Sequence, residues 1–346
     1  MTALRVSPVQ LGEPGPAPAA SPPPAIALQD LTRQFGRGRK AFTAVSELNL
    51  DVAQGQVFGL LGPNGSGKTT TINMISGLIP PTSGTVAILG MKVDARRTRR
   101  QVRRLLGTVP QETALYNELT AQANMAFHAD LYQIPRHEKA DRIARLLDLV
   151  SLADRADSRV KTFSGGMKRR LAIARALLHD PEVIILDEPT LGVDVHARAA
   201  IWGYIRDLRD RGKTILLTTN QLEEAQELCD ELAIIDHGQL VATGPPERLR
   251  RAYGATVVSL HVQTTAAPST LGYALEDLRR LGGVTDVSAE PAADASHVLA
   301  VSTQEHAEIA DIIAATARWC VIADVAIHET SLDEAFLSLT GRELRD

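Results

Sequence analysis

The chain has few cysteines, few aromatic residues and no long apolar run. Only Cys229 and Cys320 are cysteines among its 346 residues, and Phe, Trp and Tyr together make up 4%. The two thiols lie far apart in the sequence without a metal-spaced partner, so they offer no cysteine metal site and fit a reducing compartment. No stretch reaches about 18 consecutive apolar residues, so we expect no membrane span in this chain.

A strongly basic charge balance, which nucleic-acid-binding proteins commonly carry, is also missing. The formal net charge is −4 at pH 7. One basic cluster, six arginines between Arg96 and Arg104, has no aromatic residues interleaved with it. Together with the acidic balance of the whole chain, this favours a solvated helix face over a nucleic-acid site. We therefore expect no nucleic-acid partner.

The first 25 residues are rich in proline and alanine. Six prolines lie between Pro14 and Pro24. This composition predicts a disordered tail at residues 1–25. A secretory signal needs an uninterrupted apolar core, which these prolines break, so we expect the chain to stay in the cytoplasm.

A phosphate-binding loop is the most informative feature that the sequence does contain. The apolar run Val57–Leu61 predicts a buried strand before it, and Thr71–Leu78 has helical character. Glycines let successive N–H groups point at one anion, Lys68 supplies charge for the β- and γ-phosphates, and Thr69 supplies a hydroxyl for Mg²⁺. This context disfavours the alternative, a glycine-rich turn with a surface lysine. The loop consists of Gly62, Pro63, Asn64, Gly65, Ser66, Gly67, Lys68, Thr69 and Thr70.

Strand-like and helix-like segments alternate through residues 26–246, the pattern of a parallel sheet with crossover helices. Val183–Leu186 and Thr214–Leu217 are two of the expected strands. Between Leu119 and Val160 the sequence turns mostly helical. We therefore expect an α/β nucleotide-binding domain with a helical subdomain at about residues 112–180.

A different pattern follows the breaker cluster Gly244-Pro245-Pro246. Residues 247–346 alternate as β-α-β-β-α-β, the order of a small ferredoxin-like α+β domain. Ser331 and Glu334 form a capping box for a closing helix, which Gly341 can end. No catalytic cluster lies in this part of the sequence, so we interpret it as a regulatory or assembly domain.

Two further motifs carry chemistry when they are taken together with the phosphate loop. Ser164, Gly165 and Gly166 precede a helix. Alone they favour a plain capped helix over an anion site. Asp187 and Glu188 end the strand at Val183–Leu186. One acid there can hold Mg²⁺ through water, and the second can orient and deprotonate an attacking water.

In this order, the motifs from Ala25 to about Pro246 resemble the nucleotide-binding subunit of an ATP-binding cassette (ABC) transporter. In that family the Ser-Gly-Gly signature of one subunit closes on ATP held by the phosphate loop of another. The resemblance therefore implies a P-loop NTPase cassette that hydrolyses ATP with Mg²⁺, and a second ATPase subunit expected to be another copy of this chain. The residues and their implied roles are Lys68, Thr69 and Thr70 for phosphates and metal, Ser164, Gly165 and Gly166 for the γ-phosphate in trans, Asp187 as metal ligand, and Glu188 as general base.

Three more residues match the family's pattern. Gln111 resembles the glutamine that senses Mg²⁺ and contacts the membrane partner. Phe35 is similar to the aromatic residue that stacks on adenine, with a core phenylalanine as an equal alternative. Asp194 resembles the loop residue that links the two sites across the dimer.

Asn220 departs from the pattern, because the family usually carries a histidine at this position. An asparagine amide can still donate a hydrogen bond to a γ-phosphate oxygen, but it is shorter and cannot carry charge. Hydrolysis could then be slower or closure less strictly coupled to the γ-phosphate. Tolerated variation is the alternative that we favour, because Glu188 and the other motifs are intact.

Within the family, residues 58–65, 115–120 and 331–341 resemble exporter subunits of the drug-resistance, daunorubicin-type branch. This implies an exporter of drugs or other amphipathic compounds with separately encoded transmembrane permease subunits. The chain would then lie on the inner face of the cell membrane, held there by its permease. Two alternatives remain: a non-transport ABC ATPase acting on ribosomes or DNA, and an ATP-gated regulator with weak hydrolysis, which Asn220 keeps open.

Overall fold

The computed structural model divides the chain into two compact units, Met1–Pro245 with Leu344–Asp346, and Pro246–Glu343. The predicted disordered tail falls mostly outside the described residues, and within it Val9–Gln10 form strand β1, paired with β11. The structure describes residues 9–10, 22–93, 96–253, 256–263, 269–292, 296–303, 309–328 and 331–341.

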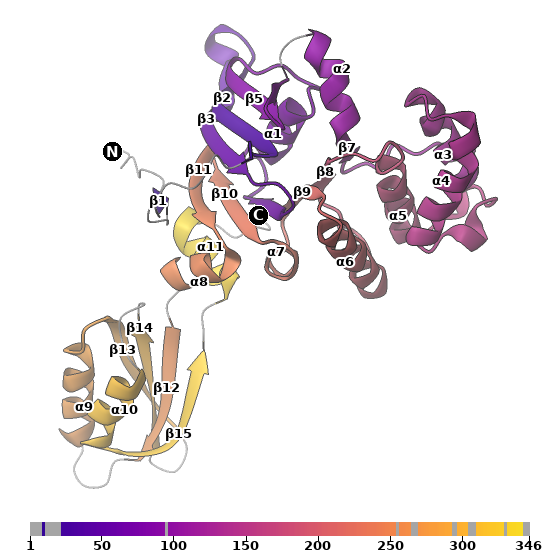
Figure 1. The fold of residues 1–346 in the computed structure, drawn as a ribbon. Coiled ribbons are helices and arrows are strands. Elements are labelled where there is room, and N and C mark those ends of the chain that lie inside the picture. Colours follow the sequence, from indigo (N-terminus) through magenta and orange to yellow (C-terminus); the bar gives the residue numbers. More distant parts are fainter. Residues whose placement is uncertain are drawn as a thin grey trace. The chain divides into compact units, whose positions relative to one another are not determined.

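A seven-stranded sheet with the order β1-β11-β10-β4-β9-β8-β7 forms the centre of the first unit (Figure 1). Its strands pair in parallel except for β10 with β11. The strands β4, β8 and β9 are buried along their whole length, as expected for parallel strands covered on both faces. The bounds are β4 Val57–Leu61, β7 Leu106–Val109, β8 Val183–Asp187, β9 Thr214–Thr219, β10 Glu231–Asp236 and β11 Gln239–Gly244.

A second, antiparallel sheet with the order β3-β2-β5-β6 shares an apolar core with the first. Ile26 and Leu28 from this sheet belong to the same cluster as Phe58 and Val183 from the large one. Helix α1 contributes Ile75 to that cluster. The bounds are β2 Ile26–Phe35, η1 Gly38–Lys40, β3 Phe42–Val52, α1 Lys68–Ile75, β5 Ser83–Ile88, β6 Met91–Lys92 and α2 Arg96–Leu105.

The expected helical subdomain is present and has a core of its own. Figure 1 shows α3, α4 and α5 grouped together, and Met125, Leu147 and Leu171 bring one buried side chain from each helix into a common cluster. The helices α6 and α7 follow β8 and β9 respectively. The bounds are α3 Ala121–Leu131, α4 Arg136–Leu149, η2 Ala153–Arg155, η3 Val160–Thr162, α5 Gly165–Ala176, α6 Val195–Asp210 and α7 Leu222–Leu228.

The second unit confirms the predicted ferredoxin-like order. Its antiparallel sheet has the order β13-β14-β12-β15, and α9 and α10 share a buried cluster with it. The predicted capping box also forms, since the Ser331 backbone N–H donates to Glu334 Oε2 at 3.1 Å and the Glu334 N–H donates to Ser331 Oγ at 3.3 Å. The bounds are α8 Pro246–Tyr253, β12 Thr256–Gln263, α9 Ser269–Arg279, β13 Val284–Pro291, β14 Ser296–Thr303, α10 Ile309–Ala317, β15 Val321–His328 and α11 Leu332–Thr340.

Within the described ranges, none of the helices combines the length and the apolar character that crossing a bilayer requires.

Candidate nucleotide site

The phosphate loop connects the buried end of β4 to α1, and close packing restricts two of its positions to glycine. A Cβ atom at Gly62 would lie 2.2 Å from the Ile235 carbonyl oxygen. At Gly67, φ is +108° and a Cβ atom would lie 2.5 Å from the Ala44 carbonyl oxygen. A side chain at either position would displace backbone that belongs to a neighbouring strand or turn.

Lys68 is held inside the loop by the loop's own backbone. It begins α1, three residues earlier than the sequence predicts, and its ammonium group donates to the carbonyl oxygens of Gly62 and Pro63, the latter at 3.1 Å. Burial lowers the pKa of Lys68, while the nearby Glu188 and Asp187 carboxylates oppose that shift. Lys68 is thus a buried cation close to the carboxylates at the end of β8. Its charge would stabilise an anionic phosphate bound in the loop.

Asp187 ends β8 and is only 6% exposed. Its carboxylate accepts a hydrogen bond of 2.6 Å from the hydroxyl of Thr218 on β9. The two residues are direct neighbours in the parallel register of β8 and β9. Sequence reasoning missed Thr218, although a hydroxyl residue directly after the apolar run Ile215–Leu217 was the available signal.

Glu188 and Gln111, 77 positions apart, meet at the same edge of the sheet. The Gln111 amide donates to Glu188 Oε2 at 2.7 Å. The Glu188 backbone has φ +50°, and its N–H donates to both the carbonyl and the hydroxyl oxygen of Thr218. Burial, and then the charge of Asp187, raise the pKa of Glu188, while Lys68 opposes them. The arrangement suits a carboxylate that receives a proton from water.

Asn220 lies against the phosphate loop. Its amide nitrogen donates to Asn64 Oδ1 at 3.2 Å. Its own Oδ1 atom and the hydroxyl of Ser66 are buried and have no hydrogen-bond partner among the described residues. Because buried polar atoms are normally satisfied, these two orphaned atoms fit a polar ligand bound in the loop.

The signature residues lie beside the Asp194 loop. Ser164 caps α5 by accepting from the Met167 N–H at 3.3 Å, and Asp194 caps α6 by accepting from the Ala197 N–H at 2.9 Å. A Cβ atom at Gly166 would lie 2.8 Å from Ala197 Cβ, so α5 and α6 touch at this point. Among the described residues, none of these contacts reaches the phosphate loop.

Phe35 is half-buried and stacks on the exposed Phe42 ring, with a centroid distance of 5.5 Å and an interplanar angle of 25°. The Arg33 guanidinium lies over the Phe35 ring at 4.6 Å. The β3 residue Ala44, two positions after Phe42, is the one that approaches Gly67. The strand that carries Phe42 therefore passes beside the phosphate loop at Ala44, and adenine stacking at Phe35 stays a prediction.

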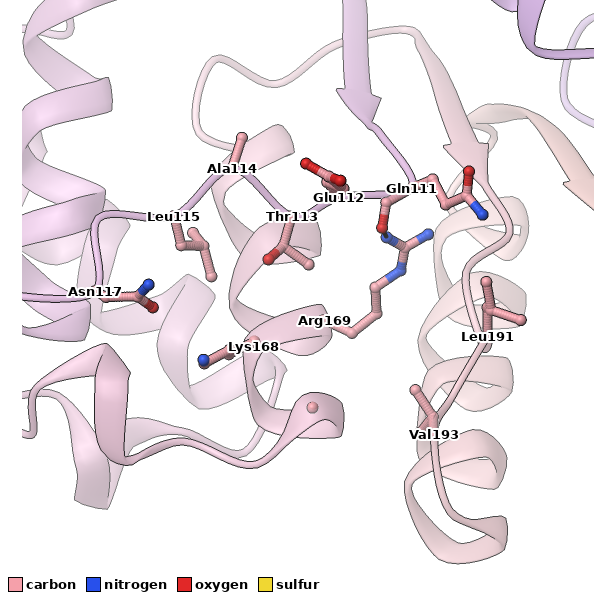
Figure 2. Close-up of a pocket in the computed structure, with 11 residues that line it drawn as sticks. Gln111, Glu112, Thr113, Ala114, Leu115, Asn117, Lys168, Arg169, Leu191 and Val193 are labelled. Atoms are coloured by element: carbon pink, nitrogen blue, oxygen red, sulfur yellow. Dashed lines mark hydrogen bonds between the residues drawn. The ribbon is translucent and has the colours of Figure 1, made fainter.

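A pocket of about 440 Å³ separates the Gln111 segment from α5 and the Asp194 loop (Figure 2). Figure 2 shows Arg169 reaching from α5 toward Gln111. The pocket is lined by Gln111, Glu112, Thr113, Ala114, Leu115, Asn117, Gly165, Lys168, Arg169, Leu191 and Val193.

Sequence reasoning also missed two buried charged residues around the site. Arg169 is 4% exposed and Glu224 is 1% exposed. The Thr190 hydroxyl and the Trp202 indole N–H donate to Glu224 Oε1 at 2.8 and 3.1 Å. For Arg169 the signal was its helical spacing, because it precedes the buried apolar residues of α5 by three, four and seven positions.

The acidic residues suit a metal ion that takes most of its ligands from the nucleotide phosphates and from water. Within the described ranges, there is no group of three or more His, Cys, Asp or Glu side chains placed to hold a metal ion by themselves. Mg²⁺ commonly takes one or two protein ligands together with phosphate oxygens and water. The buried Asp187 carboxylate, with the exposed Thr69 at the start of α1, fits that requirement.

The comparisons with known proteins agree with this geometry. The family model described as "ABC transporter" matches residues 45–191. The linearmycin resistance ATP-binding protein LnrL of Bacillus subtilis is 38% identical, over 88% of this chain and 96% of that protein. The Nod factor export ATP-binding protein I of Ralstonia nicotianae is 35% identical, over 96% and 98%. A dimeric post-hydrolysis structure of the ATP-binding cassette MJ0796 with ADP and Pi has a TM-score of 0.59 at 28% identity, over 64% of this chain and 98% of that one. The chain belongs to the ABC transporter family, as an ATP-binding subunit that hydrolyses ATP for transport.

Proposed function

We propose that this chain is the ATPase subunit of an exporter for drugs or other amphipathic compounds, working with separately encoded permease subunits at the inner face of the cell membrane. The names of two relatives support this, since one confers linearmycin resistance and the other exports Nod factor. Both are similar to this chain over nearly its whole length, including the second unit. The substrate class is the part of the proposal that rests on these relatives.

The separation of the two motif groups carries the proposal of a dimer. Lys68, Glu188 and Gln111 share the sheet edge, and Asn220 contacts the loop there. Ser164–Gly166 instead lie with Asp194, without a contact to the phosphate loop in the described residues. A site that needs both groups is therefore completed by a second copy of the chain, and a dimeric relative of known structure supports this assembly.

Each side chain then has a role in hydrolysis. The Lys68 ammonium stabilises phosphate oxygens, and Gln111 holds the Glu188 carboxylate in place. Glu188 orients water and accepts its proton. Asn220 donates a hydrogen bond to Asn64 of the phosphate loop. Mg²⁺, when bound with the nucleotide, would be held by Asp187 and Thr69 and would neutralise phosphate charge. Phe35 stacks on the base.

Mixing two inactive variants tests the composite site. Lys68→Ala removes the phosphate grip and Ser164→Arg obstructs the signature, so each variant alone should lose ATP turnover. A mixed dimer has one site in which both halves are intact. Random mixing should therefore restore up to about a quarter of wild-type turnover, because half of the dimers carry one good site of two. No recovery, with dimers present by light scattering, would contradict a site shared between two copies.

A cell-based assay tests the proposed export. Cells lacking the gene should become more sensitive to amphipathic compounds that the permease carries. Complementation with the wild-type chain should restore resistance, whereas Glu188→Gln should not, because the general base is lost. Equal resistance with both chains would contradict ATP-driven export and would favour the ATP-gated regulator, which the asparagine at position 220 keeps open.

A further inference from the structure

We propose that Arg169 is a positioning residue for ATP hydrolysis, which fixes the Gln111 segment and the end of β8 relative to the signature helix α5. The inference deepens the proposed function, because it concerns the same composite ATP site. Its test includes one measurement that needs no hydrolysis.

The guanidinium group of Arg169 donates to four backbone carbonyl groups on two different segments. On the Gln111 segment, Nη1 donates to Pro110 O at 2.7 Å and to Gln111 O at 3.1 Å. At the end of β8, Nη2 donates to Asp187 O, and just beyond it Nε donates to Pro189 O at 3.0 Å. The acceptors therefore include Gln111 itself and the residues on either side of Glu188.

Because Arg169 is buried, its charge has to be stabilised by hydrogen bonds and by nearby carboxylates. Burial lowers its pKa, while the carboxylates of Asp187, Glu224 and Glu188 oppose the shift. An arginine stays protonated in such surroundings, and its planar group offers donors in fixed directions. A lysine would keep the charge, but its single ammonium group has three N–H donors, too few for four carbonyl groups on two segments. An arginine at this position therefore matches the arrangement of the carbonyl acceptors as well as the charge of the nearby carboxylates.

The position of Arg169 in α5 connects it to the other half-site. It lies one helical turn after Gly165 and Gly166, the residues expected to meet ATP held by the partner. The hydrogen bonds from Arg169 run to the segments that carry Gln111 and Glu188, which act on the ATP of their own chain. A shift of α5 when the dimer closes on the partner's ATP would thus move Gln111 and Glu188, which act on the ATP of their own chain.

The neighbouring Arg170 is a matched control. Its Nη1 atom donates to the carbonyl oxygens of Val150 and Ser151 at 3.0 and 3.4 Å, both in the helical subdomain. It belongs to the same helix and also binds backbone carbonyls, and in the described part of the chain its hydrogen bonds go to the helical subdomain and not to the segments around Glu188. Arg169→Met and Arg170→Met therefore both remove guanidinium bonds to backbone carbonyls, four and two respectively, with different targets.

The first measurement is amide hydrogen exchange of the full chain without nucleotide. Arg169→Met should increase exchange in residues 110–117, because the carbonyls that anchor this segment lose their donor. Arg170→Met should leave that segment at the wild-type rate. Arg169→Lys should keep the fold by preserving the charge and should still show the faster exchange. Equal exchange in Arg169→Met and wild type would overturn the positioning role, whether or not the protein is an exporter.

The second measurement is steady-state ATP hydrolysis. Arg169→Met should lower kcat by about 100-fold, since small misplacement of reacting groups can cost that much. The Kd for ATP should stay within about threefold of wild type, a difference of roughly 0.6 kcal/mol, because the phosphate loop is untouched. A fall in affinity with unchanged kcat would contradict positioning of Gln111 and Glu188.

Mixed dimers distinguish positioning from simple loss of helix structure. In the mixture of Lys68→Ala and Ser164→Arg chains, the Ser164→Arg chain supplies Gln111 and Glu188 to the intact site. Adding Arg169→Met to that chain should abolish the restored turnover, whereas adding it to the Lys68→Ala chain should reduce turnover much less. The reverse order would show that Arg169 supports only the signature helix. Failure of the unmodified mixture would refute the composite site and leave the exchange measurement decisive for Arg169.

Discussion

Asn220 occupies the position at which the resemblance to the family implies a histidine. The amide bonds Asn64 in the phosphate loop, while Asn220 Oδ1 remains without a partner in the described residues. Asn220→Ala removes the donor and should lower ATP turnover several-fold, measured on the purified chain. Gln221→Ala is the matched control on the next residue. Unchanged turnover in Asn220→Ala would remove Asn220 from the mechanism.

Glu224 makes the stability of the fold depend on pH. Burial raises its pKa, and the donors Thr219, Thr190 and Trp202 oppose the shift only in part. The folded chain therefore holds this proton more tightly than the unfolded chain, whose glutamates titrate near about 4.3. As pH rises above that value, the free energy of unfolding should decrease until the folded pKa is passed.

Glu224→Gln isolates this contribution because an amide cannot titrate but can still accept both hydrogen bonds. The stability of the variant minus that of wild type should be constant below about pH 4 and increase above it, by at most about 1.4 kcal/mol per pH unit. Urea unfolding followed by Trp202 fluorescence, with Trp319 replaced by Phe in every variant, measures the difference. A pH-independent difference for Glu224→Gln would contradict the assignment.

At the scale of elements, the start of α5 depends on close contact with α6. A Cβ atom at Gly166 would lie 2.8 Å from Ala197 Cβ, whereas one at Gly165 would meet nothing nearer than Gly192 O at 3.7 Å. Gly166→Ala should therefore lower the free energy of unfolding by about 1–3 kcal/mol through overpacking. Gly165→Ala should change it by less than about 1 kcal/mol, because alanine is favoured in helices. Equal effects in urea unfolding would contradict this helix contact.

At the scale of the whole molecule, every candidate site residue belongs to the first unit. The apolar cluster that packs the β13-β14-β12-β15 sheet against α9 and α10 draws only on residues beyond Tyr253 in the described ranges, among them Val258, Leu278 and Ile312. A chain ending at residue 245 should therefore bind ATP with a Kd within about threefold of the full chain, or roughly 0.6 kcal/mol. Isothermal titration calorimetry measures this, with Lys68→Ala in the short chain as the non-binding control. A tenfold loss of affinity would show that the second unit supports the site.

The regular elements and the contiguous motifs could be predicted from the sequence because their causes are local. The phosphate loop needs glycines, a lysine and hydroxyl residues within nine positions, and all of them are neighbours in the chain. The ferredoxin-like order of the second unit follows from alternating and helical spacing, and its capping box from two residues three positions apart. The residue types that carry the chemistry of the site could therefore be predicted from the sequence without knowledge of their positions in space.

The partners of these residues depended on the fold, because strand register and helix packing bring them from distant parts of the chain. Thr218 reaches Asp187 only when β8 and β9 align, and Arg169 reaches Gln111 only when α5 packs under that segment. A buried charge is stable only where such distant partners satisfy it. The residue types required for binding a triphosphate are thus encoded along the chain, whereas the position of each reacting group is set by contacts that exist only once the chain has folded.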